Sequence, residues 1–174
     1  MVKQALFNIL AGDVVDAVWW DLFGGTGAVG IEALSRGAAF VRFTELNRLA
    51  IETIHWNLQH TGFEAQAEVR RGDAFTMLVS PPDRAFDYVY IAPPQYKEMW
   101  SKALRTLDAN PGWLSEGAWV IVQIHPKEYR HLEFKNLTEF EERKYGSTLL
   151  VFYEEGSKVE GNCSGIAHFP DSAG

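Results

Sequence analysis

The chain has 174 residues, of which 47% are apolar and 13% aromatic, so it can bury one sizeable core and is not a disordered chain. No apolar run reaches the roughly 20 residues that span a bilayer. The net charge of -7 and the pI of about 5.2 argue against electrostatic binding of nucleic acid over a broad surface.

Residues 1–10 form a predicted amphipathic helix that is not followed by a signal-peptide cleavage site. From Val18 onward, short apolar runs alternate with helical patterns, which indicates βαβ units and a parallel sheet. The predicted strands span 18–22, 40–45, 66–70, 87–91 and 117–124, and the predicted helices span 28–36, 47–60, 74–79 and 97–109.

The pattern changes in the last third of the chain. Two strand-like runs within residues 139–153 meet across 145–147, with too few residues for a helical crossover, so they predict an antiparallel hairpin. We expect one domain over 1–154 and a Gly/Ser-rich tail over 155–174. An open, mostly parallel sheet of this kind binds ligands at the carboxyl ends of its strands.

A glycine-rich stretch, DLFGGTGAVG, follows the first predicted strand and opens a helix at residues 21–30. Gly25, Gly27 and Gly30 satisfy the pattern G-x-G-x-x-G, in which glycines let the backbone approach a ligand at a helix N-terminus. A tight strand-to-helix turn without a ligand is the alternative. Nicotinamide and flavin dinucleotide folds share this pattern, which therefore leaves the class of cofactor open.

Acidic residues follow the first three strands. Asp21 would oppose a pyrophosphate but would balance the cationic end of an amino acid ligand or a sulfonium. Glu45 can hold a ribose in either class of cofactor. Asp73 can accept from an adenine amine while Ala74 leaves room for the ring, although a helix N-cap is an equally good role for Asp73. With a Pro-Pro corner after the fourth strand, this set favours S-adenosyl-L-methionine.

These stretches resemble the class I S-adenosylmethionine-dependent methyltransferases, and more closely the RsmD-type methyltransferases of guanine N2 in 16S ribosomal RNA. The resemblance extends to Tyr153 and is carried by QALFNIL (4–10), DLFGGTGAVGIEALSRGA (21–38), VRFTE (41–45), NLQHTGF (57–63), RGDAF (71–75), FDYVYIAPPQY (86–96) and RKYGSTLLVFY (143–153). The run containing ALSRGA and the YGST hairpin are more specific than the glycine loop alone.

The resemblance implies a Rossmann-like class I methyltransferase fold: an α/β protein with an open, mostly parallel seven-stranded sheet and a C-terminal antiparallel hairpin. It implies a monomer that acts on small-subunit ribosomal RNA or on an assembling small-subunit particle and does not bind a membrane. The expected location is the cytoplasm, or an organelle if a presequence was removed. We expect S-adenosyl-L-methionine, or its product S-adenosyl-L-homocysteine, to contact Asp21, Phe23, Gly25, Gly27, Gly30, Glu45, Leu46, Asp73 and Ala74.

The substrate amine is expected at Ala92, Pro93, Pro94, Gln95 and Tyr96. Methylation of a guanine amine requires an in-line approach and acceptors for the amine protons, so the protein supplies orientation rather than a strong base. The prolines leave the carbonyls of Ala92 and Pro93 outside a regular ladder, and the amide oxygen of Gln95 is a further candidate acceptor. Tyr96, or alternatively Tyr90, is expected to stack on a flipped base.

The chain departs from the family pattern at two places. The family corner usually reads Asp-Pro-Pro-Tyr, whereas Ala92 and Gln95 stand here, and the family has a basic arm ahead of the first helix, whereas this sequence begins almost at that helix. The missing carboxylate leaves a catalytically silent cofactor-binding module or ribosome assembly factor as the alternative function. A nicotinamide-dependent oxidoreductase is opposed by Asp21 and by the Pro-Pro corner. We expect no metal, since Cys163 is the single cysteine and the histidines lack paired spacing.

Overall fold

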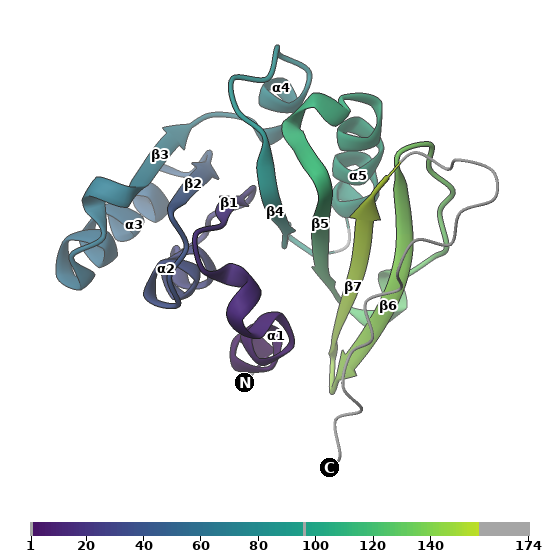
Figure 1. Cartoon of the computed structure of the whole chain (residues 1–174), viewed down its shortest axis with the longest axis horizontal. Helices are drawn as coiled ribbons and strands as arrows, with labels where there is room; N and C mark the ends of the chain where they lie inside the picture. The colour runs from purple at the N-terminus through teal and green to yellow at the C-terminus, as the bar shows by residue number, and fades with distance from the viewer. Residues whose placement is uncertain (1, 96, 157–174) are drawn as a thin grey trace.

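The structure is a computed structural model that describes residues 2–95 and 97–156. Seven strands form one sheet in the order β3-β2-β1-β4-β5-β7-β6 (Figure 1). The strands are β1 (Val18–Asp21), β2 (Phe40–Glu45), β3 (Ala67–Arg71), β4 (Phe86–Ile91), β5 (Leu114–Ile124), β6 (Leu137–Tyr145) and β7 (Thr148–Glu155). Neighbouring strands pair in parallel, except that β7 runs antiparallel to both β5 and β6. The predicted fold class is confirmed.

Helices cover both faces of this sheet (Figure 1). The α-helices are α1 (Val2–Leu10), α2 (Ala28–Ser35), α3 (Arg48–Thr61), α4 (Ala74–Leu78) and α5 (Met99–Ala109), and the short 3₁₀ helices are η1 (Ala11–Val14), η2 (Glu64–Gln66), η3 (Pro111–Trp113) and η4 (Pro126–Glu128). Helices α1, α2 and α3 contribute to one buried apolar cluster, and α4 and α5 contribute to the other. Within the described ranges, no helix has the length and apolar character needed to cross a membrane.

The observed elements follow the predicted ones closely, with the largest difference at β5. This strand begins at Leu114, whereas the apolar pattern predicted a start at 117. Gly117 adopts a φ of 73°, and the pairing of β5 with β4 shifts register near Phe86 and Tyr88, so the pattern is interrupted inside the strand. Most of the predicted tail lies outside the described residues.

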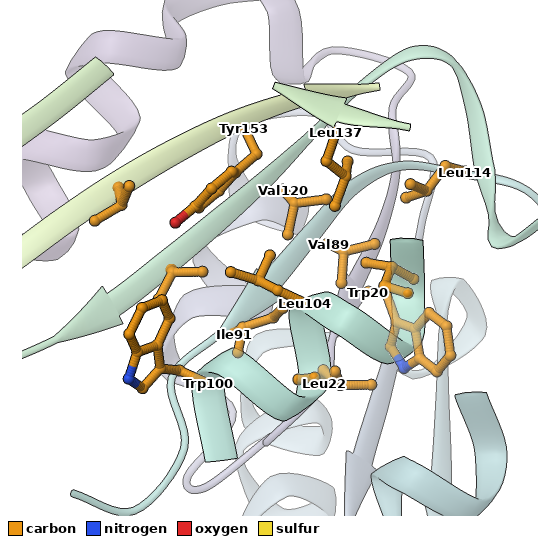
Figure 2. Packing of buried hydrophobic residues seen from close by; sticks show 14 of the residues in the cluster. Trp20, Leu22, Val89, Ile91, Trp100, Leu104, Leu114, Val120, Leu137 and Tyr153 are labelled. Atoms are coloured by element: carbon orange, nitrogen blue, oxygen red, sulfur yellow. The ribbon is translucent and has the colours of Figure 1, made fainter. Parts of the chain in front are cut away.

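The central strands are buried on both faces. Figure 2 shows Val89 and Ile91 of β4 on the side of the sheet where Trp100 and Leu104 of α5 pack. On the opposite face, Trp19 stacks on Phe7 of α1 and on Tyr88 of β4, with ring centroids 5.5 and 5.2 Å apart. Burial on both faces explains the continuous apolar runs of these strands, and it leaves their carboxyl ends as the place for polar chemistry.

A buried arginine joins β2 to the loop before β4. Arg42 is fully buried, and its Nη1 and Nη2 atoms donate to the two carboxylate oxygens of Asp83 at 3.0 and 2.7 Å. Its guanidinium also lies over the rings of Trp20, Phe86 and Trp113, at 5.1 to 5.9 Å from their centroids. The hydrogen bonds from Arg42 lower the pKa of Asp83 to about 2.

Candidate active site

A cavity of about 370 Å³ opens at the carboxyl ends of β1 to β4, which is room for a nucleoside-bearing ligand. Its lining residues are Leu22, Phe23, Gly25, Thr44, Glu45, Leu46, Gly72, Asp73, Ala74, Phe75, Ala92, Pro93, Pro94 and Met99. The strand ends are held together by backbone hydrogen bonds from Leu22 N to Tyr90 O, from Gly24 N to Thr44 O and from Gly72 N to Glu45 O, at 2.8 to 3.0 Å. The cavity therefore has a wall fixed by the sheet itself.

The three glycines of the motif have different roles. Gly25 lines the cavity and has a φ of 56°, and Gly27, with a φ of 83°, is the N-cap of α2. Gly30 packs inside the fold, where a Cβ atom would lie 2.3 Å from the Phe43 ring. Of the glycines expected at the cofactor, the structure therefore places only Gly25 in the cavity wall, while Gly27 permits the turn and Gly30 permits close packing of α2 on β2.

Asp21 is buried and precedes the lining residue Leu22. Its side chain is 2% exposed, and its Oδ1 atom has no hydrogen-bond partner among the described residues. Burial raises its pKa well above 3.8, and the charge of Glu45 acts in the same direction, while a hydrogen bond with the Gly30 backbone opposes them. A buried carboxyl oxygen without a partner is costly, and a cationic group of a ligand would offset that cost. Asp21 does not line the cavity in the described structure.

Glu45 connects three segments at the cavity. Its Oε1 accepts from the Gly25 N–H at 3.0 Å, and its Oε2 accepts from the N–H groups of Leu46 and Asn47 at 2.7 and 2.9 Å. Leu46 is 62% exposed, although it lines the cavity. The carboxylate therefore holds the glycine loop against the turn into α3, and Oε1, which accepts only one of these three bonds, keeps acceptor capacity for a hydroxyl group.

Asp73 has the N-cap role considered for it, and its contact with the cofactor stays a prediction. It is the N-cap of α4, because its Oδ1 accepts from the N–H groups of Phe75 and Thr76 at 2.7 and 3.3 Å. Both capping bonds end on the same oxygen, so Oδ2 can face a ligand. Ala74 lines the cavity beside Phe75, whose ring meets the ring of Phe23 edge-on at 6.0 Å. An apolar wall of two rings thus adjoins the carboxylate.

The corner after β4 completes the opposite wall. Ala92, Pro93 and Pro94 line the cavity, whereas Gln95 is exposed and does not. Tyr96 lies outside the described residues. Tyr90 is 3% exposed and its hydroxyl donates to the amide oxygen of Gln123, so it packs in the core and does not present a ring for base stacking.

Sequence reasoning missed five of the lining residues, namely Leu22, Thr44, Gly72, Phe75 and Met99. The first four are sequence neighbours of predicted contacts at the strand ends, so a wider window around each strand end would have found them. Met99 comes from the start of α5 and reaches the cavity only because the chain turns back after the Pro-Pro corner.

Comparison with known proteins places the chain in a family. The family model described as "Conserved hypothetical protein 95" matches residues 1–154. The chain is 32% identical to YlbH of Bacillus subtilis over 157 residues, which are 88% of this chain and 84% of that protein. It is 31% identical to Ribosomal RNA small subunit methyltransferase D of Haemophilus influenzae over 155 residues, 88% of this chain and 79% of that protein.

The chain belongs to this family. The predicted RsmD-type resemblance is thereby confirmed. Among solved structures, the RsmD-type chain superposes on yhhF from Escherichia coli with a TM-score of 0.81 and 28% identity, over 88% of this chain and 84% of the other. The family match ends one residue before β7 does, so it includes every strand that borders the RsmD-type cavity.

Proposed function

We propose that this chain is an S-adenosyl-L-methionine-dependent methyltransferase that acts on the N2 amine of a guanine in small-subunit ribosomal RNA. One observation carries the proposal: carboxylates stand at or just after the ends of three adjacent strands, and two of them, Glu45 and Asp73, line a cavity that the Pro-Pro corner also lines. Carboxylates in this number suit a cationic nucleoside and would repel a pyrophosphate. The family membership and the name of the Haemophilus influenzae relative support the ribosomal RNA substrate.

The residues present fit this cofactor. Glu45 Oε1 keeps one acceptor site for a ribose hydroxyl, and Asp73 Oδ2 can accept from the adenine amine beside the apolar wall of Phe23 and Phe75. The orphaned Oδ1 atom of Asp21 is buried next in sequence to the lining residue Leu22, where a carboxylate would favour the positive end of the amino acid part. When bound, S-adenosyl-L-methionine supplies an electrophilic methyl group on a good leaving group.

The chain contributes positioning rather than acid-base chemistry to the transfer. The N2 lone pair is delocalised into the guanine ring, so the amine must be held in line with the methyl group. Backbone carbonyls of Ala92 and Pro93 can accept hydrogen bonds from the amine N–H groups as positive charge develops on nitrogen. Ala92 provides no side-chain acceptor, so the acceptors for the substrate amine are these carbonyls and the side-chain amide of a neighbouring residue.

The test is methyl transfer from labelled S-adenosyl-L-methionine to small-subunit particles that lack the modification, followed by mass spectrometry of the nucleosides. We expect labelled N2-methylguanosine, and particles already carrying the modification serve as the control. Binding of S-adenosyl-L-homocysteine without transfer to any particle would instead support the silent cofactor-binding module. Calorimetry with NADH tests the oxidoreductase hypothesis, and we expect no heat of binding.

A further inference from the structure

A polar pair lies beside the corner after β4, outside the residues assigned so far. The hydroxyl of Tyr90 on β4 donates to Oε1 of Gln123 on β5. Burial and the nearby Asp21 carboxylate raise the pKa of Tyr90, so its hydroxyl stays protonated and acts as the donor. An amide oxygen has two lone pairs, and this bond uses one of them. The other remains for a second donor.

The sheet register places Gln123 next to Ala92. Ile91 is the partner of Val122 in the parallel pairing of β4 with β5, so the residues that follow them, Ala92 and Gln123, are neighbours at the ends of adjacent strands. Side chains alternate along a strand, and Tyr90 and Ile121 belong to the same apolar cluster, against which Ala92 also packs. Ala92 and Gln123 therefore share one face of the sheet, at its carboxyl edge.

Two glutamines, Gln95 and Gln123, lie near this corner, and they differ in how firmly their side chains are held. Neither lines the cavity assigned to the cofactor, so neither competes with it for space. Gln95 is exposed, whereas Gln123 is half-buried and has its oxygen oriented by the buried hydroxyl of Tyr90. An acceptor that is already oriented loses less side-chain entropy when the substrate arrives. Gln123 is thus the better candidate to replace the side-chain acceptor that an aspartate at position 92 would supply.

We propose that Gln123 is the side-chain acceptor for the substrate amine, with Tyr90 as the residue that positions it. This inference rests on the proposed function. In the transfer, the N2 lone pair forms a bond to the methyl carbon, and the electron pair of the breaking S–C bond returns to sulfur. Gln123 Oε1 accepts a hydrogen bond from N2–H while positive charge develops, and the released proton passes to water, because an amide is too weak a base to keep it.

The experiment measures single-turnover methyl transfer to small-subunit particles at saturating S-adenosyl-L-methionine. Gln123→Ala should lower the rate about 10-fold, which corresponds to one lost hydrogen bond. Gln123→Glu, which keeps an oxygen acceptor, should restore most of the rate. Gln59→Ala removes an exposed amide on α3 and serves as the matched control with an unchanged rate. The affinity for S-adenosyl-L-homocysteine should be equal in all of them.

A purely structural role for Gln123 predicts a different result. If Gln123 only satisfies the buried hydroxyl of Tyr90, then Tyr90→Phe removes the need for it, and adding Gln123→Ala should change neither stability nor transfer. Our proposal requires the double variant to transfer about 10-fold more slowly than Tyr90→Phe alone. Equal rates in this pair, with an active wild-type enzyme, overturn the role of Gln123. An inactive wild-type enzyme overturns the proposed function instead.

Discussion

The Glu45 carboxylate accepts a hydrogen bond from the Gly25 backbone N–H at 3.0 Å and so joins the end of β2 to the glycine loop. Its second oxygen holds the turn into α3 through Leu46 and Asn47. One side chain therefore positions three segments around the cavity and keeps one acceptor site for a ribose hydroxyl.

Glu45→Gln should weaken binding of S-adenosyl-L-homocysteine about 10-fold, because charge-assisted hydrogen bonds are roughly twice as strong as neutral ones. Titration calorimetry at pH 7 measures this effect. Glu52→Gln is the matched control: Glu52 lies on the exposed surface of α3, where it pairs with Arg48 at 3.4 Å. Equal affinities in the two variants would remove Glu45 from the cofactor site.

Asp21→Asn should remove a pH dependence of stability. Because burial raises the pKa of Asp21 in the folded state above 3.8, its contribution is most favourable below pH 3.8 and is lost as the pH rises through the folded pKa. Relative to the wild type, the variant should therefore gain stability as the pH rises from 3 to 7. Urea unfolding across this range measures it. A difference that is constant with pH would show that the carboxyl titrates normally.

The same Asp21→Asn change should act in the opposite direction on binding. A neutral amide cannot balance a cationic ligand, so we expect the affinity for S-adenosyl-L-methionine at pH 7 to fall about 10-fold. A filter-binding assay with labelled cofactor measures it. A variant that is more stable yet binds as tightly as the wild type would contradict the assignment of Asp21 to the cofactor.

Asp83→Asn should destabilise the fold by about 1 kcal/mol at pH 7, since the Asp83 side chain is 44% exposed and solvent screens its pairing with Arg42. The pKa of Asp83 is lowered to about 2, so its stabilisation is present above 3.8 and is lost as the pH falls through about 2. The unfolding free energies of the wild type and the variant should therefore converge in acid. Denaturant midpoints at pH 7 and pH 2.5 test this; an equal gap at both values would contradict it.

Gly30→Ala should cost about 1–3 kcal/mol of unfolding free energy, because the added methyl group overlaps the Phe43 ring. Gly12→Ala is the control, since a Cβ there meets nothing within 4 Å and the change should be nearly neutral. Thermal unfolding distinguishes the two. If Gly30→Ala weakens cofactor binding without loss of stability, the glycine contacts the ligand rather than the sheet.

Much of this protein can be predicted from local patterns. Alternation of apolar runs and helical periods predicts the order of the elements, and the short link at 145–147 predicts the antiparallel hairpin. Carboxylates at the ends of consecutive strands point to one site, because parallel strands end at the same edge of a sheet. The roles of these side chains with the cofactor and substrate, like the monomeric state, remain predictions.

The amino-acid sequence by itself determined the class of fold, the family and the strand ends where chemistry occurs, since these depend on residue type and on spacing along the chain. Only the tertiary structure decided that Gly30 packs against Phe43, that Asp21 is buried and does not line the cavity, and that Ile91 pairs with Val122 so that Ala92 and Gln123 follow paired residues. Each of these facts depends on how segments that are separate in the chain pack together. They depend on strand order and register, which local periodicity does not encode.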